Sequence, residues 1–117
     1  MALPDAPAQV NSWIELSERG ATLVLRIGGE LDAATRTAME PTVAAAIASA
    51  GSVLLDLSEL TFCDSSGIAM FIDVHKQALA NGTGLAIRRP HPAVRRVIEI
   101  TGLNALIPIE DQRGLTT

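Results

Sequence analysis

The segment from Ser52 to Ser58 restricts the possible folds of this chain more than any other. It reads Ser-Val-Leu-Leu-Asp-Leu-Ser, a run apolar enough to form a strand covered on both faces. A helical pattern follows it, from Ile68 to Ala80. A buried strand that leads into an amphipathic helix is typical of layered α/β domains.

The rest of the chain extends this alternation. Two strands come first, and helices and strands then follow in turn. Asp32 is a good N-cap for a helix that begins at Ala33, and Gly51, Gly82 and Gly102 are predicted to end the three helices. The predicted segments are strand Trp13–Leu16, turn Ser17–Gly20, strand Ala21–Ile27, helix from Ala33, strand Ser52–Ser58, helix Ile68–Ala80, strand Thr83–Arg88, helix Ala93–Thr101 and a short edge strand near Leu106–Ile109.

This pattern predicts an α/β fold: a single-layer mixed sheet of four to five strands with helices packed against it. The order of the strands cannot be read from the pattern. In the first helix, Met39, Val43, Ile47 and Ala50 mark a buried stripe. Pro41 interrupts it, so either the helix kinks there or Pro41 opens the main helix after a short first turn.

Length and composition predict one domain. The chain has 117 residues, which is enough for one core and too few for two. We expect a flexible lead-in over residues 1–9, the domain over residues 10–110 and a tail over residues 111–117. The lead-in has no secretory pattern, and the Ala-rich run between Glu40 and Asp56 is too interrupted to span a bilayer. We therefore expect a soluble, cytoplasmic protein.

Charge and cysteine content exclude several classes of function. The net charge of −4 argues against nucleic acid as a partner. Cys63 is the only cysteine, which excludes an internal disulfide and a cysteine-built zinc site. Lys76 is the only lysine, and no Gly-x-x-x-x-Gly-Lys pattern surrounds it, so a P-loop is excluded.

The segment Asp64-Ser65-Ser66-Gly67 is the candidate functional motif. It lies where a strand gives way to a helix, and a helix N-terminus exposes unpaired N–H groups that favour an anion or a phosphate ester. An α/β-hydrolase elbow needs Gly-x-Ser-x-Gly, and the first glycine is missing here. We expect His75 and His91 to have structural roles, so neither is a candidate general base for the serines. We expect no enzymatic activity.

Helical geometry separates the two serines. Ser66 falls on one side of the helix with Met70, Asp73 and Gln77, and we expect that side to face outward. Ser65 lies closer to the other side and is expected to cap the helix, although ordinary capping would explain either serine. An outward Met70 beside polar residues indicates a contact surface for another protein. The opposite, buried side is predicted to hold Ile68, Phe71, Ile72, His75, Ala78 and Leu79.

Three segments in this order resemble the STAS domain and, more narrowly, the bacterial anti-sigma factor antagonists. They are Gly29-Glu30-Leu31-Asp32, Leu55-Asp56-Leu57-Ser58 and Phe62-Cys63-Asp64-Ser65-Ser66-Gly67. The resemblance runs from about Val10 to Ile109. It is supported by Pro92-Ala93-Val94-Arg95-Arg96 and Thr101-Gly102-Leu103, which are similar to the last helix of the family and its exit.

The resemblance implies a partner-switching protein that is monomeric when free and binds no cofactor of its own. The second serine of the motif, Ser66, would accept phosphate from an anti-sigma factor with a GHKL-type kinase fold, and a PP2C-type phosphatase would remove it. Asp32 matches the acidic residue that the family places near the acceptor. The expected partner-binding residues are Asp32, Asp64, Ser65, Ser66, Gly67, Met70 and Asp73.

Two alternatives remain open. One is a STAS-fold adaptor that is not phosphorylated, such as a scaffold subunit of a sensory complex. The other is a module that binds a small anionic ligand at the start of the helix.

Overall fold

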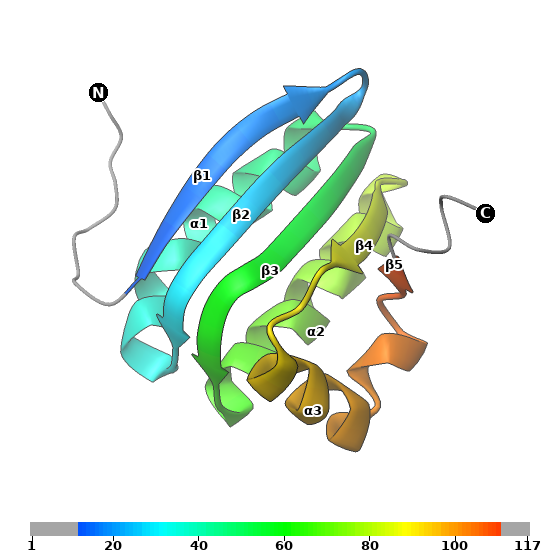
Figure 1. The fold of residues 1–117 in the computed structure, drawn as a ribbon. Coiled ribbons are helices and arrows are strands. Elements are labelled where there is room, and N and C mark those ends of the chain that lie inside the picture. Colours follow the sequence, from blue (N-terminus) through cyan, green and yellow to red (C-terminus); the bar gives the residue numbers. More distant parts are fainter. Residues whose placement is uncertain (1–11, 111–117) are drawn as a thin grey trace.

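The computed structural model describes residues 12–110, so the predicted lead-in and tail lie outside the described residues. Five strands form one sheet in the order β1-β2-β3-β4-β5 (Figure 1). β1 is antiparallel to β2, whereas β2, β3, β4 and β5 run parallel to their neighbours. This arrangement confirms the predicted α/β fold with a mixed sheet and supplies the strand order that the sequence left open.

The N-terminal hairpin is longer than predicted. β1 is Ser12–Arg19 and β2 is Thr22–Leu31, so the turn shrinks to Gly20 and Ala21. β2 continues through Gly28 and Gly29, beyond the predicted end of the strand at Ile27. The indole of Trp13 covers Gly28 so closely that no Cβ would fit there, and Gly29 takes a φ of 91° at an irregularity in the β2–β3 register. The two glycines therefore shape the strand and do not end it.

The first helix, α1, spans Ala33–Ser49 and has Asp32 as its N-cap, as predicted. It runs without a break through Pro41, so the idea of a separate first turn before Pro41 is wrong. Pro41 and Thr37 lie on the exposed side of α1. Because proline has no N–H, the Thr37 carbonyl loses its helical partner, but at an exposed position water can replace it.

The remaining elements keep the predicted order with shifted ends. β3 (Ser52–Cys63) extends five residues beyond the predicted end at Ser58, and α2 (Ser65–Asn81) ends at Gly82, whose φ is 71°. The elements that follow are β4 (Gly84–Arg88), α3 (Pro92–Thr101), the 3₁₀ turn η1 (Leu103–Ala105) and β5 (Ile109–Glu110). The predicted edge strand is real but only two residues long.

The main core lies between the sheet and its helices. In Figure 1, α1 and α2 lie side by side behind the sheet, and fully buried side chains such as Leu25, Leu55 and Phe71 belong to one cluster there. Within residues 12–110 the second face of β3 differs from the prediction, because α1 and α2 both lie behind the sheet (Figure 1) and Leu54 stays only half-buried. Asp56 is nevertheless fully buried, since Arg88 and Arg89 bind its carboxylate at 3.1 and 2.8 Å.

Within the described residues, no helix has the length and apolar character needed to cross a membrane.

Candidate functional site

The site lies at the end of the sheet where two neighbouring parallel strands, β2 and β3, run into helices. Leu31 and Cys63 are paired across these strands, and the N–H of Asp64 donates to the Leu31 carbonyl at 3.2 Å. The next residue after each strand, Asp32 or Asp64, is the N-cap of a helix. Strand pairing therefore places two carboxylates and two helix N-termini at one edge of the sheet.

Both aspartates hold backbone N–H groups that the helices leave unpaired. Asp64 Oδ1 accepts from the N–H groups of Ser66 at 2.9 Å and Gly67 at 3.3 Å. Asp32 Oδ1 accepts from the Thr35 N–H at 3.0 Å, while Thr35 Oγ1 accepts from the Asp32 N–H at 2.9 Å, which forms a capping box. The backbone N–H of Thr35 is the main cause of the lowered pKa of Asp32, and the Thr35 hydroxyl adds to it.

Gly67 lets the first turn of α2 approach the strands closely. A Cβ at this position would lie 2.5 Å from Cys63 Sγ and 2.9 Å from Leu31 Cγ, closer than side chains tolerate. Gly67 is therefore needed for space and not for an unusual backbone angle. This close approach sets the distance between the first turn of α2, which contains Ser65 and Ser66, and the ends of β2 and β3.

The structure does not distinguish the two serines in the predicted way. Ser65 is exposed and Ser66 is half-buried, although we expected Ser65 to lie nearer the buried side. The expected capping role of Ser65 is wrong, because Asp64 caps α2. Within residues 12–110, neither serine hydroxyl makes a hydrogen bond. Both hydroxyls are therefore free to react or to meet a partner.

The prediction that Met70 faces outward is wrong. Met70 is fully buried, because the side of α2 that carries Ser66, Met70, Asp73 and Gln77 turns toward α1. Gln77 donates its side-chain amide to the Ala44 carbonyl of α1 at 2.9 Å. Polar residues on a helix face can thus form hydrogen bonds to a neighbouring helix. A helical projection of a single segment does not reveal such contacts. Leu79, predicted to be buried, is 70% exposed.

Arg36 of α1 is a residue of the site that was not predicted from the sequence. Its guanidinium binds Asp73 Oδ2 of α2 at 2.6 Å and Glu40 Oε1 at 2.8 Å, and its Nη1 reaches the Ser66 carbonyl at 3.5 Å. The hydrogen bonds to Glu40 and then to Asp73 raise the pKa of Arg36. The spacing of Arg36 and Glu40 predicts a pair within one helix, but no local pattern connects Arg36 with Asp73.

Comparison with known proteins shows what this arrangement is related to. The family described as "Mlab, STAS domain" matches residues 14–108, most of the chain. The chain belongs to the STAS-domain family. It is 30% identical over 104 residues to a protein named anti-sigma F factor antagonist from Paenibacillus polymyxa, covering 87% of this chain and 89% of the relative.

Two further comparisons agree. The chain is 29% identical to an anti-sigma-B factor antagonist of Listeria monocytogenes, over 90% of this chain and 94% of the relative. The crystal structure of an anti-sigma factor antagonist from Mycobacterium paratuberculosis superposes with a TM-score of 0.77 at 26% identity, covering 93% of this chain and 89% of the other. Within the STAS family, the chain thus belongs to the anti-sigma factor antagonists.

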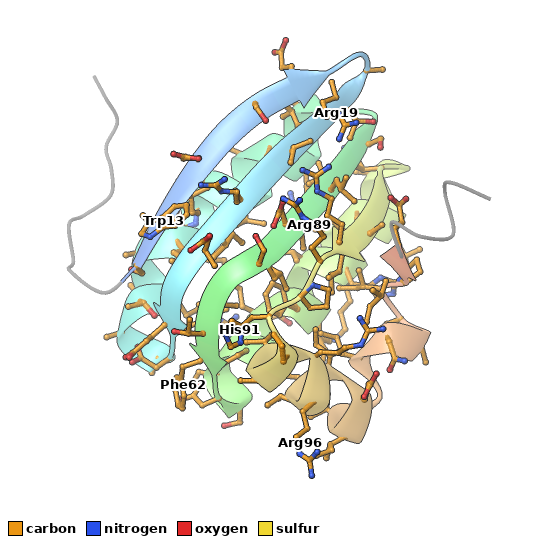
Figure 2. All side chains as sticks on the ribbon, viewed as in Figure 1. Trp13, Arg19, Phe62, Arg89, His91 and Arg96 are labelled. Carbon is orange, nitrogen blue, oxygen red and sulfur yellow. The ribbon has the colours of Figure 1, made fainter. Side chains whose placement is uncertain are left out.

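Phe62 is a second residue of this STAS domain that was not among the predicted partner-binding residues, although it begins the segment Phe62–Gly67. It lies two residues before Asp64 at the end of β3, where Figure 2 labels it, and 47% of it is exposed. It pairs with Glu30 across β2 and β3. An exposed aromatic ring next to the two N-cap aspartates gives this edge the apolar spot that we had expected from Met70.

The Cys63 thiol and the His91 imidazole both have structural roles. Burial, with a further contribution from the charge of Asp64, raises the pKa of the Cys63 thiol to about 12, so it stays protonated and unreactive. His91 caps α3 by accepting the Ala93 N–H at 3.1 Å. Among residues 12–110, no three His, Cys, Asp or Glu side chains gather as a metal site would require.

Proposed function

We propose that this STAS domain binds an anti-sigma factor when Ser66 is unmodified and releases it when Ser66 carries phosphate. The observation that supports this most is that the Ser65 and Ser66 hydroxyls, in the first turn of α2, lack hydrogen-bond partners within residues 12–110. Such a position favours added negative charge. The relatives named anti-sigma factor antagonists supply the class of partner.

The chemistry belongs to the partners. An anti-sigma factor of the GHKL kinase type would hold ATP and transfer its γ-phosphoryl group to Ser66 Oγ, which gives up its proton while ADP stays with the kinase. A PP2C-type phosphatase would hydrolyse the ester with water and restore the hydroxyl. This chain supplies the acceptor and its surroundings, and it needs no cofactor.

The switch would act across the interface rather than through the fold. Phosphate adds about −1.5 to −2 charge near neutral pH, beside Asp32 and Asp64. The start of α2 tolerates this charge, because helix N-termini favour anions. A partner surface that accepts the unmodified serine would then face bulk, a greater desolvation cost and repulsion from its own carboxylates.

Exposure does not favour Ser66 over Ser65, because Ser65 is the more exposed of the two. The assignment to Ser66 rests on the similarity of the motif to that of the family. The proposed contact surface consists of Asp32, Asp64, Ser65, Ser66 and Asp73, with Phe62 in place of the buried Met70. Gly67 is buried and lies beneath this surface, where it packs against Cys63 and Leu31.

The direct test is to incubate the protein with ATP and a GHKL-type anti-sigma factor of the same organism and to measure its intact mass. We expect a gain of one phosphate that Ser66→Ala abolishes and Ser65→Ala leaves in place. Phosphate on the Ser66→Ala variant would move the acceptor elsewhere. If the protein binds this anti-sigma factor without ever gaining phosphate, the non-phosphorylated adaptor would replace the switch. Thermal stabilisation by phosphate-bearing metabolites alone would favour the anion-binding module.

A further inference from the structure

Arg36 of α1 contacts α2, and the N–H groups of its guanidinium differ in how strongly they are hydrogen-bonded. Nε and Nη2 bind the Glu40 carboxylate at 2.8 and 3.3 Å, and Nη2 also binds Asp73 at 2.6 Å. Nη1 makes only a 3.5 Å contact with the Ser66 carbonyl, which is a weak hydrogen bond. The least committed donors of the guanidinium therefore lie against Ser66.

The position of Ser66 on α2 brings it toward Arg36. Ser66, Met70, Asp73 and Gln77 share the side of α2 that packs against α1, and the full burial of Met70 closes the space beneath them. The Arg36 side chain is 24% exposed and covers this side near its N-terminal end. A group attached to Ser66 therefore enters the surroundings of Arg36.

The charges at this place are unbalanced before any modification. Arg36 is the cation, and Glu40 and Asp73 both bind it. The Asp64 carboxylate lies close by, as the N-cap that binds the Ser66 N–H. Among the described residues, no second salt bridge neutralises Asp73. Phosphate on Ser66 would add a dianion to a site that already holds more carboxylates than guanidinium groups.

We propose that Arg36 is the phosphate-binding residue for Ser66, and that it exchanges Asp73 for the phosphoryl group when Ser66 is modified. A phosphate dianion carries more charge than a carboxylate and offers three acceptor oxygens to the planar guanidinium. Glu40 stays bound through Nε and holds the arginine in place during the exchange. The inference rests on the proposed function in one respect, namely that phosphate is attached at Ser66.

The exchange would carry the signal along the helix. Asp73 lies about two turns beyond Ser66, roughly 10 Å along the axis of α2. Once Arg36 leaves it, the half-exposed Asp73 carboxylate presents its full charge to a partner. Part of the negative charge gained at the start of α2 therefore appears farther along the helix. A docking partner would sense phosphorylation at two places on α2.

The test places phosphoserine at position 66 during translation and titrates it by ³¹P NMR. The second phosphate pKa should be lower with Arg36 present than in Arg36→Gln, by roughly half a unit or more, because Arg36 favours the dianion. Arg36→Lys should restore part of the difference. Arg95→Gln is the matched control, since Arg95 forms a similar pair with Glu99 on α3. Equal values in the original chain and Arg36→Gln would overturn the proposal.

A second comparison tests the exchange itself. Asp73→Asn should lower the phosphate pKa more in the original chain than in the Arg36→Gln background, because only the former has a guanidinium to release. Equal effects in both backgrounds would show that Asp73 and the phosphoryl group do not compete for Arg36, which would overturn the exchange. Circular dichroism of each variant checks that it is folded.

These measurements do not depend on any kinase, because the phosphoserine is installed by the ribosome. A shifted phosphate pKa without kinase modification would reject the switch and keep the phosphate-binding role of Arg36. Kinase modification with an unshifted phosphate pKa would support the switch and reject the phosphate-binding role of Arg36.

Discussion

Gly67 lies so close to Cys63 that a Cβ on the glycine would come within 2.5 Å of the sulfur. This contact sets the start of α2 directly on the ends of β2 and β3. The position of the candidate phosphoacceptor therefore depends on a packing restraint one residue away. The restraint is steric, and it can be tested without any partner.

Gly67→Ala should lower the free energy of unfolding by about 1–3 kcal/mol, because the added methyl group must displace Cys63 and Leu31. Urea unfolding measures this. Gly51→Ala is the control, since a Cβ there meets no atom within 4 Å. Adding Cys63→Ala to Gly67→Ala should recover part of the loss. Similar stability of the two glycine variants would contradict the steric explanation.

Phe62→Ser should weaken binding of the anti-sigma factor about tenfold while leaving stability nearly unchanged, because the ring is half exposed at the edge that carries the serines. Isothermal titration calorimetry gives the affinity, and thermal unfolding gives the stability. Ile100→Ser removes an even more exposed apolar side chain from α3 and serves as the control. If both variants bind equally well, Phe62 is not part of the contact surface.

Asp56 should make the protein sensitive to acid. Burial alone would raise its pKa, but hydrogen bonds from the Ser58 N–H and hydroxyl, and from Arg89 and Arg88, outweigh burial and lower the pKa to about 2. The unfolded chain protonates this group at a higher pH, near 4. The stabilisation is therefore complete above that pH and is lost as the pH falls toward 2.

Asp56→Asn should cost about 2 kcal/mol of unfolding free energy at neutral pH, because Arg88 and Arg89 lose their charged partner. The difference from the original chain should shrink between pH 4 and pH 2, as denaturant unfolding at each pH will show. Glu15→Gln, which breaks the exposed pair with Arg26, should change little. A constant difference across this range would rule out Asp56 as the titrating group.

The sequence predicted most of the fold because each boundary carries a local signal. Asp32 and Gly82 mark helix ends through capping chemistry, and the apolar run from Val53 fixes a central strand. The predicted strand ended too early, before Gly28 and Gly29, because the contact that explains Gly28 comes from Trp13 on the neighbouring strand. A signal that lies on another strand cannot be read from local composition.

The sequence singled out Asp64 and Ser66, but it did not show which residues surround them. Asp64 and Ser66 stand out because the motif is continuous in the sequence. Met70 was misplaced, because the direction of a helix face depends on which element packs beside it. The Arg36–Asp73 pair joins residues 37 positions apart, and only the packing of α1 against α2 brings them together.

The central claim is that phosphate on Ser66 controls docking and leaves the fold intact. It is tested most directly by measuring the affinity of the anti-sigma factor for the protein with serine or phosphoserine at position 66, together with the melting temperature of each form. We predict at least about tenfold weaker binding by the phosphorylated form, with Tm changed by less than about 3 °C. A large fall in Tm with unchanged affinity would contradict the account.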